Sequence, residues 1–202
     1  MPEATPIKIM GAGLSGLAAA TIIARSGRAV EVYDIRDDSG ARFDGDFQAL
    51  ENWSMPIDFF EQLKEWGFDP DEFKSTDFRS LDLIHPDDEI TTAQSDAVAF
   101  RIVERGTSPH TIDQGFKRMA EAEGVKIHYK TRISEDDCDI IATGPKGTSA
   151  VAYGEIFHTT HQNKISFQLN DKLAPGAYSY LIIIDGVGLI CTCLWRKQKK
   201  SE

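Results

Sequence analysis

Three glycines near the amino terminus stand at the spacing of a phosphate-binding turn. They lie in Gly11-Ala12-Gly13-Leu14-Ser15-Gly16, a GxGxxG pattern. In such a turn the first glycine permits a sharp bend, the second lets the backbone approach a pyrophosphate, and the third lets the next helix pack closely on the strand. The N–H groups and positive dipole end of that helix would attract the two phosphates. A glycine-rich turn without a ligand is the alternative interpretation.

An acid follows at the distance that a ribose-binding residue requires. Asp34 lies roughly 20 positions after Gly11, the offset expected of a carboxylate that accepts ribose hydroxyls; a strand-end aspartate that caps a turn is the alternative. The carboxylate argues against NADP because it would repel a 2′-phosphate, although Arg36 nearby weakens that argument. Arg36 and Arg42 follow on a polar segment, where a guanidinium could reach the pyrophosphate or adenine or remain solvated.

The elements around these residues form a βαβ pattern. Residues 7–10 are a short apolar run that ends at Gly11, residues 14–26 are rich in Ala, Leu and Ile before a Gly27 stop, and residues 30–33 are a second β-branched run. The crossover is long enough for parallel strands, so we expect the second strand to lie parallel beside the first. The glycine turn would then join a strand to a helix.

The rest of the chain alternates between helical and strand patterns. Apolar spacing and turn signals predict a second antiparallel layer of hairpins from Tyr153 to Trp195, with turns at 170–171 and 185–186. Before it, we expect a loop over 35–53, a helix over 56–66, antiparallel strands within 73–104 around a turn at 85–88, a helix capped by Ser108 or Thr111 that runs to Glu123, a strand over 125–129, and a buried parallel strand over 140–142.

Two later segments, together with the glycine loop and Asp34, carry a resemblance to a known family. They are DIIATG from Asp139 to Gly144 and LAPGAYSYLIIIDG from Leu173 to Gly186. The chain resembles FAD-dependent oxidoreductases with a p-hydroxybenzoate hydroxylase-like cofactor domain, most closely their geranylgeranyl reductase-like branch. The resemblance implies an α/β fold: a Rossmann-like FAD/NAD(P)-binding βαβ domain with an additional antiparallel β-sheet layer.

The resemblance also assigns residues to the cofactor. It implies that Ala142, Thr143 and Gly144 line the ADP half of FAD, that residues 131–133 pass the adenine, and that Arg105 approaches the flavin. With the residues of the glycine loop, the predicted cofactor-binding set is Gly11, Ala12, Gly13, Leu14, Ser15, Gly16, Asp34, Ile35, Arg36, Arg42, Arg105, Ile133, Ala142, Thr143 and Gly144. The domain limits expected are 1–72 and 106–150 for FAD binding, 73–105 for inserted antiparallel strands, 151–196 for a partial substrate-domain sheet and 197–202 for a tail.

The sequence departs from the family at its carboxyl end. In the family a later Gly-Asp motif followed by a helix holds the ribityl chain and pyrophosphate, and no such segment follows Trp195; the chain ends in RKQKKSE. We therefore expect a C-terminally truncated chain that recognises the ADP moiety and retains flavin weakly or not at all. A sheet cut off here would expose an edge at 189–195, through which the chain could form a homo-oligomer.

Composition excludes other classes. The formal net charge of −10 disfavours nucleic acid as a partner, three cysteines cannot form a complete disulfide framework, and no segment has the length and apolarity of a membrane span. A cytoplasmic protein is expected.

The remaining candidate sites have simpler explanations. The five histidines are scattered, so no metal site is predicted. We interpret Cys191 and Cys193 as buried thiols that pack within a sheet, and not as a redox pair. The Lys-rich end could touch anionic lipid.

Three functions remain open at this point. The first is an oxidoreductase that passes hydride from NAD(P)H through FAD to a small-molecule or isoprenoid-like acceptor; the cofactor would carry the chemistry, so no catalytic side chain can be named. The second is a truncated, catalytically inactive nucleotide-binding module. The third is an NAD-dependent dehydrogenase. It would share the glycine loop, but neither the ATG strand nor the antiparallel sheet supports it.

Overall fold

The computed structural model describes residues 5–54, 56–144 and 150–195. These residues form two compact units. The first comprises residues 5–48, 57–75 and 103–144, and the second comprises 49–54, 56, 76–102 and 150–195. The run of basic residues predicted to form a tail lies outside the described residues.

The first unit is built on a four-stranded sheet in the order β8-β2-β1-β9. Its strands are β1 (Ile7–Met10), β2 (Val30–Tyr33), β8 (Lys126–His128) and β9 (Ile140–Ile141), and every pairing in the sheet is parallel. The predicted parallel arrangement of the first two strands is confirmed. Ile9 and Val32 are fully buried at the centre of the sheet, as the β-branched pattern of these strands requires.

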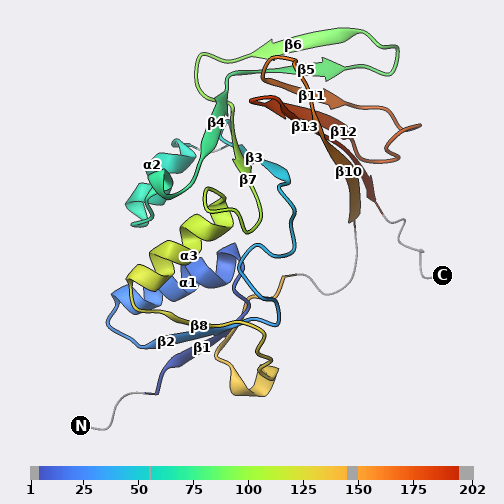
Figure 1. Cartoon of the computed structure of the whole chain (residues 1–202). Helices are drawn as coiled ribbons and strands as arrows, with labels where there is room; N and C mark the ends of the chain where they lie inside the picture. The colour runs from blue at the N-terminus through green and yellow to red at the C-terminus, as the bar shows by residue number, and fades with distance from the viewer. Residues whose placement is uncertain (1–4, 55, 145–149, 196–202) are drawn as a thin grey trace, which may run out of the picture. The chain divides into compact units, whose positions relative to one another are not determined.

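Two helices lie side by side on one face of this sheet (Figure 1). They are α1 (Leu14–Arg25) and α3 (Ile112–Ala122). In α1 the buried residues recur one turn apart, at Gly16 and Leu17 and again at Ala20 and Thr21. The Thr111 hydroxyl accepts the Gln114 N–H at the start of α3, so of the two predicted caps Thr111 is the one used.

The first unit also contains a short helix and two 3₁₀ turns. Helix α2 (Phe59–Glu65) begins three residues later than the predicted start at Pro56, because the Asp58 carboxylate accepts the N–H groups of Phe60 and Glu61 and so caps the helix there. The 3₁₀ turn η1 (Pro70–Glu72) follows, and a second one, η2 (Glu135–Asp137), precedes β9. Phe68 and Phe73 both stack on Phe116 of α3.

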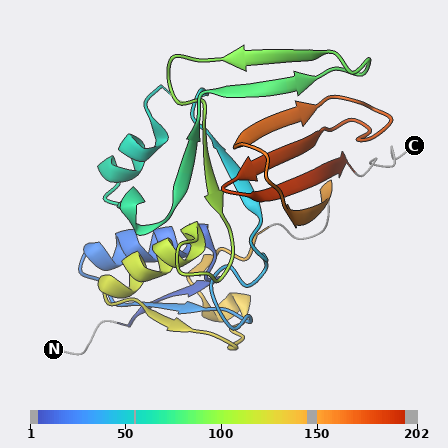
Figure 2. The same cartoon turned by 45° about the horizontal axis from the view of Figure 1, so that its top comes forward.

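The second unit contains a six-stranded sheet in the order β10-β13-β12-β11-β5-β6 (Figures 1 and 2). All its pairings are antiparallel except that of β11 with β5, which is parallel. The predicted additional antiparallel layer is confirmed. Its strands are β5 (Ser80–Ile84), β6 (Ile90–Gln94), β10 (Ala150–His158), β11 (Lys164–Gln168), β12 (Ser179–Ile184) and β13 (Val187–Trp195).

A third sheet has three strands in the order β3-β7-β4. They are β3 (Phe47–Glu51), β4 (Ser75–Phe78) and β7 (Phe100–Glu104). The prediction of a loop over 35–53 is therefore wrong for β3. This strand does not alternate between apolar and polar residues, and its pairing with β7 supplies backbone hydrogen bonds that no local pattern reveals.

Two further expectations are wrong. The strand predicted as buried at 140–142 is β9, which lies at the end of its sheet with Ile141 50% exposed, since β1 is its one partner within the described ranges. The edge predicted at 189–195 does not exist, because β13 pairs with β12 on one side and with β10 on the other. The strand at that end of the sheet is β10.

Candidate dinucleotide site

The first glycine of the loop lies where three strand ends meet. The Gly11 N–H donates to the Tyr33 carbonyl at the end of β2, and the Ala142 N–H donates to the Met10 carbonyl, each over 2.7 Å. Gly11 has a φ of +107°, and a Cβ on it would lie 2.5 Å from the Ala142 carbonyl oxygen. Only glycine satisfies both conditions at this position.

The other two glycines differ in the space around them. A Cβ on Gly16 would lie 1.9 Å from the Gly11 carbonyl oxygen, so Gly16 is what lets α1 approach the strand. No atom in the described part of the chain lies within 4 Å of a Cβ built on Gly13. Gly13 is also the N-cap of α1, and no side chain of the described residues caps the first-turn N–H groups. A helix start of this kind presents backbone donors and positive dipole charge to open space, with Leu14 and Ser15 as its first residues.

The Asp34 side chain is held against the glycine loop. Its Oδ2 accepts the Ala12 N–H and its Oδ1 accepts the Arg36 N–H, both at 2.8 Å. A carboxylate has about four lone-pair sites, so each oxygen can accept one bond more. The Asp34 carbonyl accepts the Thr131 N–H at 2.9 Å, which brings the segment leading to Ile133 beside the acid.

The structure therefore brings most of the predicted residues together. Gly11–Gly16, Asp34, Thr131 and Ala142 are joined by the contacts above, and Thr143 and Gly144 continue from Ala142 as exposed residues. Ile35 and the Arg36 side chain lie just beyond Asp34 and are exposed, Ile35 to 62%.

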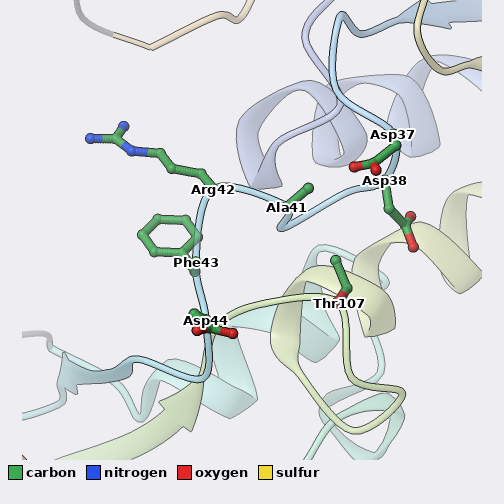
Figure 3. A pocket seen from close by; sticks show the side chains of 7 residues that line it. All are labelled: Asp37, Asp38, Ala41, Arg42, Phe43, Asp44 and Thr107. Atoms are coloured by element: carbon green, nitrogen blue, oxygen red, sulfur yellow. The ribbon is translucent and has the colours of Figure 1, made fainter. Parts of the chain in front are cut away.

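Arg42, which lies in the loop after β2, lines a pocket. The pocket has a volume of about 590 Å³ and lies between the segment after β2 and the loop before α3. Arg42 is exposed, and its guanidinium lies 5.7 Å from the centre of the Phe43 ring. Figure 3 shows the Arg42 side chain pointing away from the carboxylates of Asp37 and Asp38. The residues that line the pocket are Asp37, Asp38, Ala41, Arg42, Phe43, Asp44 and Thr107.

A polar cluster that the sequence did not suggest fixes this loop to α3. Asp38 accepts a hydrogen bond of 2.7 Å from Lys117, the Gln114 amide donates to the Ser39 carbonyl at 2.9 Å, and the Ser39 hydroxyl lies 2.7 Å from the Tyr129 hydroxyl. Its members come from three distant segments without a shared motif. No local spacing could have revealed them.

Charge and burial oppose each other inside this cluster. Burial acts to raise the pKa of the Asp38 carboxyl, but hydrogen bonds from Lys117, Gln114 and the Ser39 N–H outweigh it and hold that pKa below its usual value. Burial acts to lower the pKa of Lys117, and its bond to Asp38 raises it overall. Burial raises the pKa of the Tyr129 hydroxyl. Asp38 and Lys117 are thus both ionised at neutral pH, and Tyr129 is neutral.

Arg105 takes part in an internal ion pair. It makes two hydrogen bonds to Asp113, at 2.8 and 2.9 Å, and a third to the Gln48 side chain at 2.5 Å. Its guanidinium lies 4.0 Å from the centre of the Phe43 ring. Asp113 is 1% exposed and also accepts the Gly106 N–H. The structure thus gives Arg105 partners within its own unit, and its predicted approach to a flavin stays a prediction.

Other chemistry finds little support in the described residues. All three cysteines are free, and burial raises the pKa of the Cys193 thiol, whose neighbour on the strand is Cys191. Over residues 5–54, 56–144 and 150–195, no three His, Cys, Asp or Glu side chains gather as metal ligands. No helix in this part of the chain has the length and apolarity needed to cross a membrane.

Comparison with known proteins supports the fold. Residues 9–48 match the family described as "NAD(P)-binding Rossmann-like domain". No curated protein matches the sequence. Among solved structures, a geranylgeranyl bacteriochlorophyll reductase-like protein from Thermoplasma acidophilum is 15% identical with a TM-score of 0.68, covering 94% of this chain and 56% of its own.

Two other solved structures are similar to a comparable degree. PqsL from P. aeruginosa, in complex with 2-aminobenzoylacetate, is 12% identical with a TM-score of 0.65, and CtdE in complex with FAD is 12% identical with a TM-score of 0.63. They cover 95% and 98% of this chain, which in turn spans 61% of each. The resemblance predicted from the sequence is thus confirmed at the level of the fold: the chain has the Rossmann-like α/β fold with an added antiparallel sheet that these reductase-like and FAD-linked structures share.

Proposed function

We propose that the chain is the cofactor-binding part of a flavin-dependent oxidoreductase and holds the ADP moiety of FAD on its glycine loop. The observation that carries the proposal is the open space at Gly13, at the uncapped start of α1, with the Asp34 carboxylate bonded to the same loop. This arrangement fits a dinucleotide: donors without side-chain partners for the pyrophosphate, and an acid with spare lone pairs for ribose hydroxyls.

The residues of the chain would bind and orient the cofactor. The first-turn N–H groups of α1 would hold the pyrophosphate, Asp34 the adenosine ribose, and the backbone of residues 131–133 would pass the adenine. Ala142 to Gly144 would lie on the far side of the loop from Asp34. When bound, FAD would supply the hydride and electron transfer, with NAD(P)H as reductant.

The acceptor belongs to the same proposal. A small-molecule or isoprenoid-like acceptor agrees with the reductase-like neighbour, although this chain spans only 56% of that protein. An isoprenoid substrate would bring the protein to a membrane surface. A cytoplasmic setting is consistent with three free cysteines.

Two other functions each have an observation in their favour. An NAD-dependent dehydrogenase agrees with the family description of residues 9–48. A nucleotide-binding module without catalysis agrees with the site as described, because the uncapped start of α1 and the Asp34 carboxylate would both serve binding. Each differs from the leading proposal in the ligand that binds, or in what the bound ligand can do.

Titration of the purified chain with FAD, ADP and NAD, followed by calorimetry, tests the proposal. We expect FAD and ADP to bind and NAD to bind more weakly. A Gly13→Val variant, whose side chain would fill the open space, should lose at least about tenfold in affinity for FAD, or about 1.4 kcal/mol. Tighter binding of NAD than of FAD would support the dehydrogenase. FAD that binds but is not reduced by NADH or NADPH would support the non-catalytic module.

A further inference from the structure

Among the residues that the structure describes, the strand β10 forms one end of the six-stranded sheet. Within the described residues its one neighbour is β13, with which it pairs without interruption from Ala150 to His158. All nine of its residues are exposed. An edge strand of this kind carries a row of backbone groups that a further strand could pair with.

The ladder shows which backbone groups are open. The Thr159 N–H donates to the Gly186 carbonyl at 2.9 Å, one step beyond the last pair of β10 and β13. Residues of an antiparallel ladder alternate between bonding to one neighbour and to the other. Hence the odd-numbered residues of β10 bond to β13, and the N–H and C=O groups that face the open edge belong to Ala150, Ala152, Gly154, Ile156 and His158.

Devices that normally protect an edge are missing from this strand. It contains no proline, no lysine and no bulge, and Glu155 is its one acidic or basic residue other than histidine. Its exposed side chains are largely apolar: Tyr153 is 70% exposed, Val151 49% and Ile156 45%. The opposite edge, β6, is shorter and carries threonines and a glutamine.

We infer that β10 pairs antiparallel with β10 of a second copy of this chain, about a two-fold axis at Gly154. In this register the five open residues of each copy pair with those of the other, and all nine residues overlap. Two bonds per facing pair give about ten hydrogen bonds.

Side-chain chemistry supports the same register. Glu155 of each copy faces Tyr153 of the other, and Val151 faces Phe157, so no two like charges stand opposite each other. This matters because the chain carries a net charge of −10, which otherwise opposes self-association. A two-fold contact is also closed, so it uses up the edge in a dimer instead of propagating.

Light scattering coupled to size-exclusion chromatography, over a range of protein concentrations, tests the dimer. We expect the full chain to reach twice its monomer mass. Ile156→Pro removes one edge-facing N–H from each copy without removing a bond to β13, and we expect it to weaken the dimer by about a hundredfold. A parent chain that stays monomeric throughout, or that grows into open polymers, overturns the inference.

The matched control is Ile90→Pro on the opposite edge. The His85 N–H donates to the Glu89 carbonyl, so by the same alternation the Ile90 N–H also faces away from its sheet. Ile90→Pro should leave the dimer unchanged. Equal loss of the dimer in both variants would show that proline acts through the sheet as a whole, and would count against β10 as the interface. Circular dichroism verifies that both variants are folded.

The register has its own test. A Tyr153→Cys chain mixed with a Glu155→Cys chain should form a disulfide-linked heterodimer under mild oxidation, because these positions face each other across the axis. Each variant alone should link far less. Peptide mass spectrometry distinguishes this link from any that involves Cys138, Cys191 or Cys193. Equal linking in the mixture and in the separate variants overturns the register.

Discussion

The Oδ2 atom of Asp34 accepts the Ala12 N–H at 2.8 Å, which fixes the acid against the glycine loop across 22 positions of sequence. Asp34→Asn would remove the charge and place an amide where an acceptor is needed. Since hydrogen bonds to charged groups contribute about 1.5–3 kcal/mol, we expect affinity for FAD to fall by at least about tenfold. Calorimetric titration measures the change.

Asp87→Asn is the matched control for that variant. Asp87 also accepts the N–H of the residue two positions later, Glu89, but it lies in the turn between β5 and β6 in the other unit. Its affinity for FAD should equal that of the parent chain. A loss as large as that of Asp34→Asn would mean that any change of charge weakens binding, and Asp34 would then have no specific part in it.

Gly13 and Gly16 should respond to substitution in opposite ways. Gly16→Ala would place a Cβ 1.9 Å from a backbone oxygen, so we expect the free energy of unfolding to fall by about 1–3 kcal/mol. Gly13→Ser meets no atom within 4 Å and adds the hydroxyl that caps helices well, so unfolding should cost about 0.5 kcal/mol more. Urea denaturation measures both changes.

The stabilised variant should also be the weaker binder. The hydroxyl that Gly13→Ser introduces would accept from the N–H groups that we assign to the pyrophosphate, so stability and affinity for FAD should change in opposite directions. Calorimetric titration of this variant with FAD measures the affinity. If Gly13→Ser binds FAD as well as the parent chain does, the start of α1 is not the phosphate site.

The buried ion pair of Arg105 and Asp113 should matter more than an exposed one. Asp113→Asn leaves a guanidinium with 12% side-chain exposure without its charge partner, and we expect a loss of about 3 kcal/mol in the free energy of unfolding. Glu61→Gln, which breaks the exposed pair with Lys64 on α2, should cause no measurable change. Similar losses in both variants would contradict the role of burial.

The pair formed by Asp38 and Lys117 predicts a pH dependence of stability. The folded-state pKa of Asp38 is lowered, so its contribution is fully present above the unfolded value of about 3.9 and is lost as pH falls through the folded pKa. The pKa of Lys117 is raised, so its contribution is lost only as pH rises past about 10.4. Stability should be compared between the parent chain and Asp38→Asn.

The expected difference between these two chains has a defined shape. It should stay constant from about pH 5 to 9 and shrink below about pH 4, as the carboxyl takes up a proton first in the unfolded state and then in the folded state. Chemical denaturation at a series of pH values measures it. A difference that persists unchanged at the lowest pH would show that the substitution acts by packing and not by charge.

The sequence predicted the local elements of the site and missed its long-range ones. The glycine loop, β1, α1 and β2 follow from residues that are neighbours in the chain, where periodicity and turn glycines are informative. The cluster of Asp38, Lys117 and Tyr129 joins three separate segments, and the partners of β13 are set by pairing across the sheet. Neither set of contacts produces a periodic pattern in the sequence. For that reason the exposed edge of the sheet was assigned to the wrong strand.

The close contact between the Ala142 backbone and Gly11 has a consequence for the folding of the protein during its synthesis. The same junction joins Lys8 to Asp139 by a backbone-to-carboxylate hydrogen bond across 131 positions. At about 5–20 residues per second, the ribosome needs roughly 7–26 seconds to add the 131 residues that separate the two halves of that junction. The glycine turn of the nascent chain therefore stays incomplete until residues 139–142 have been added, and the proposed cofactor could meet the complete junction only after that point.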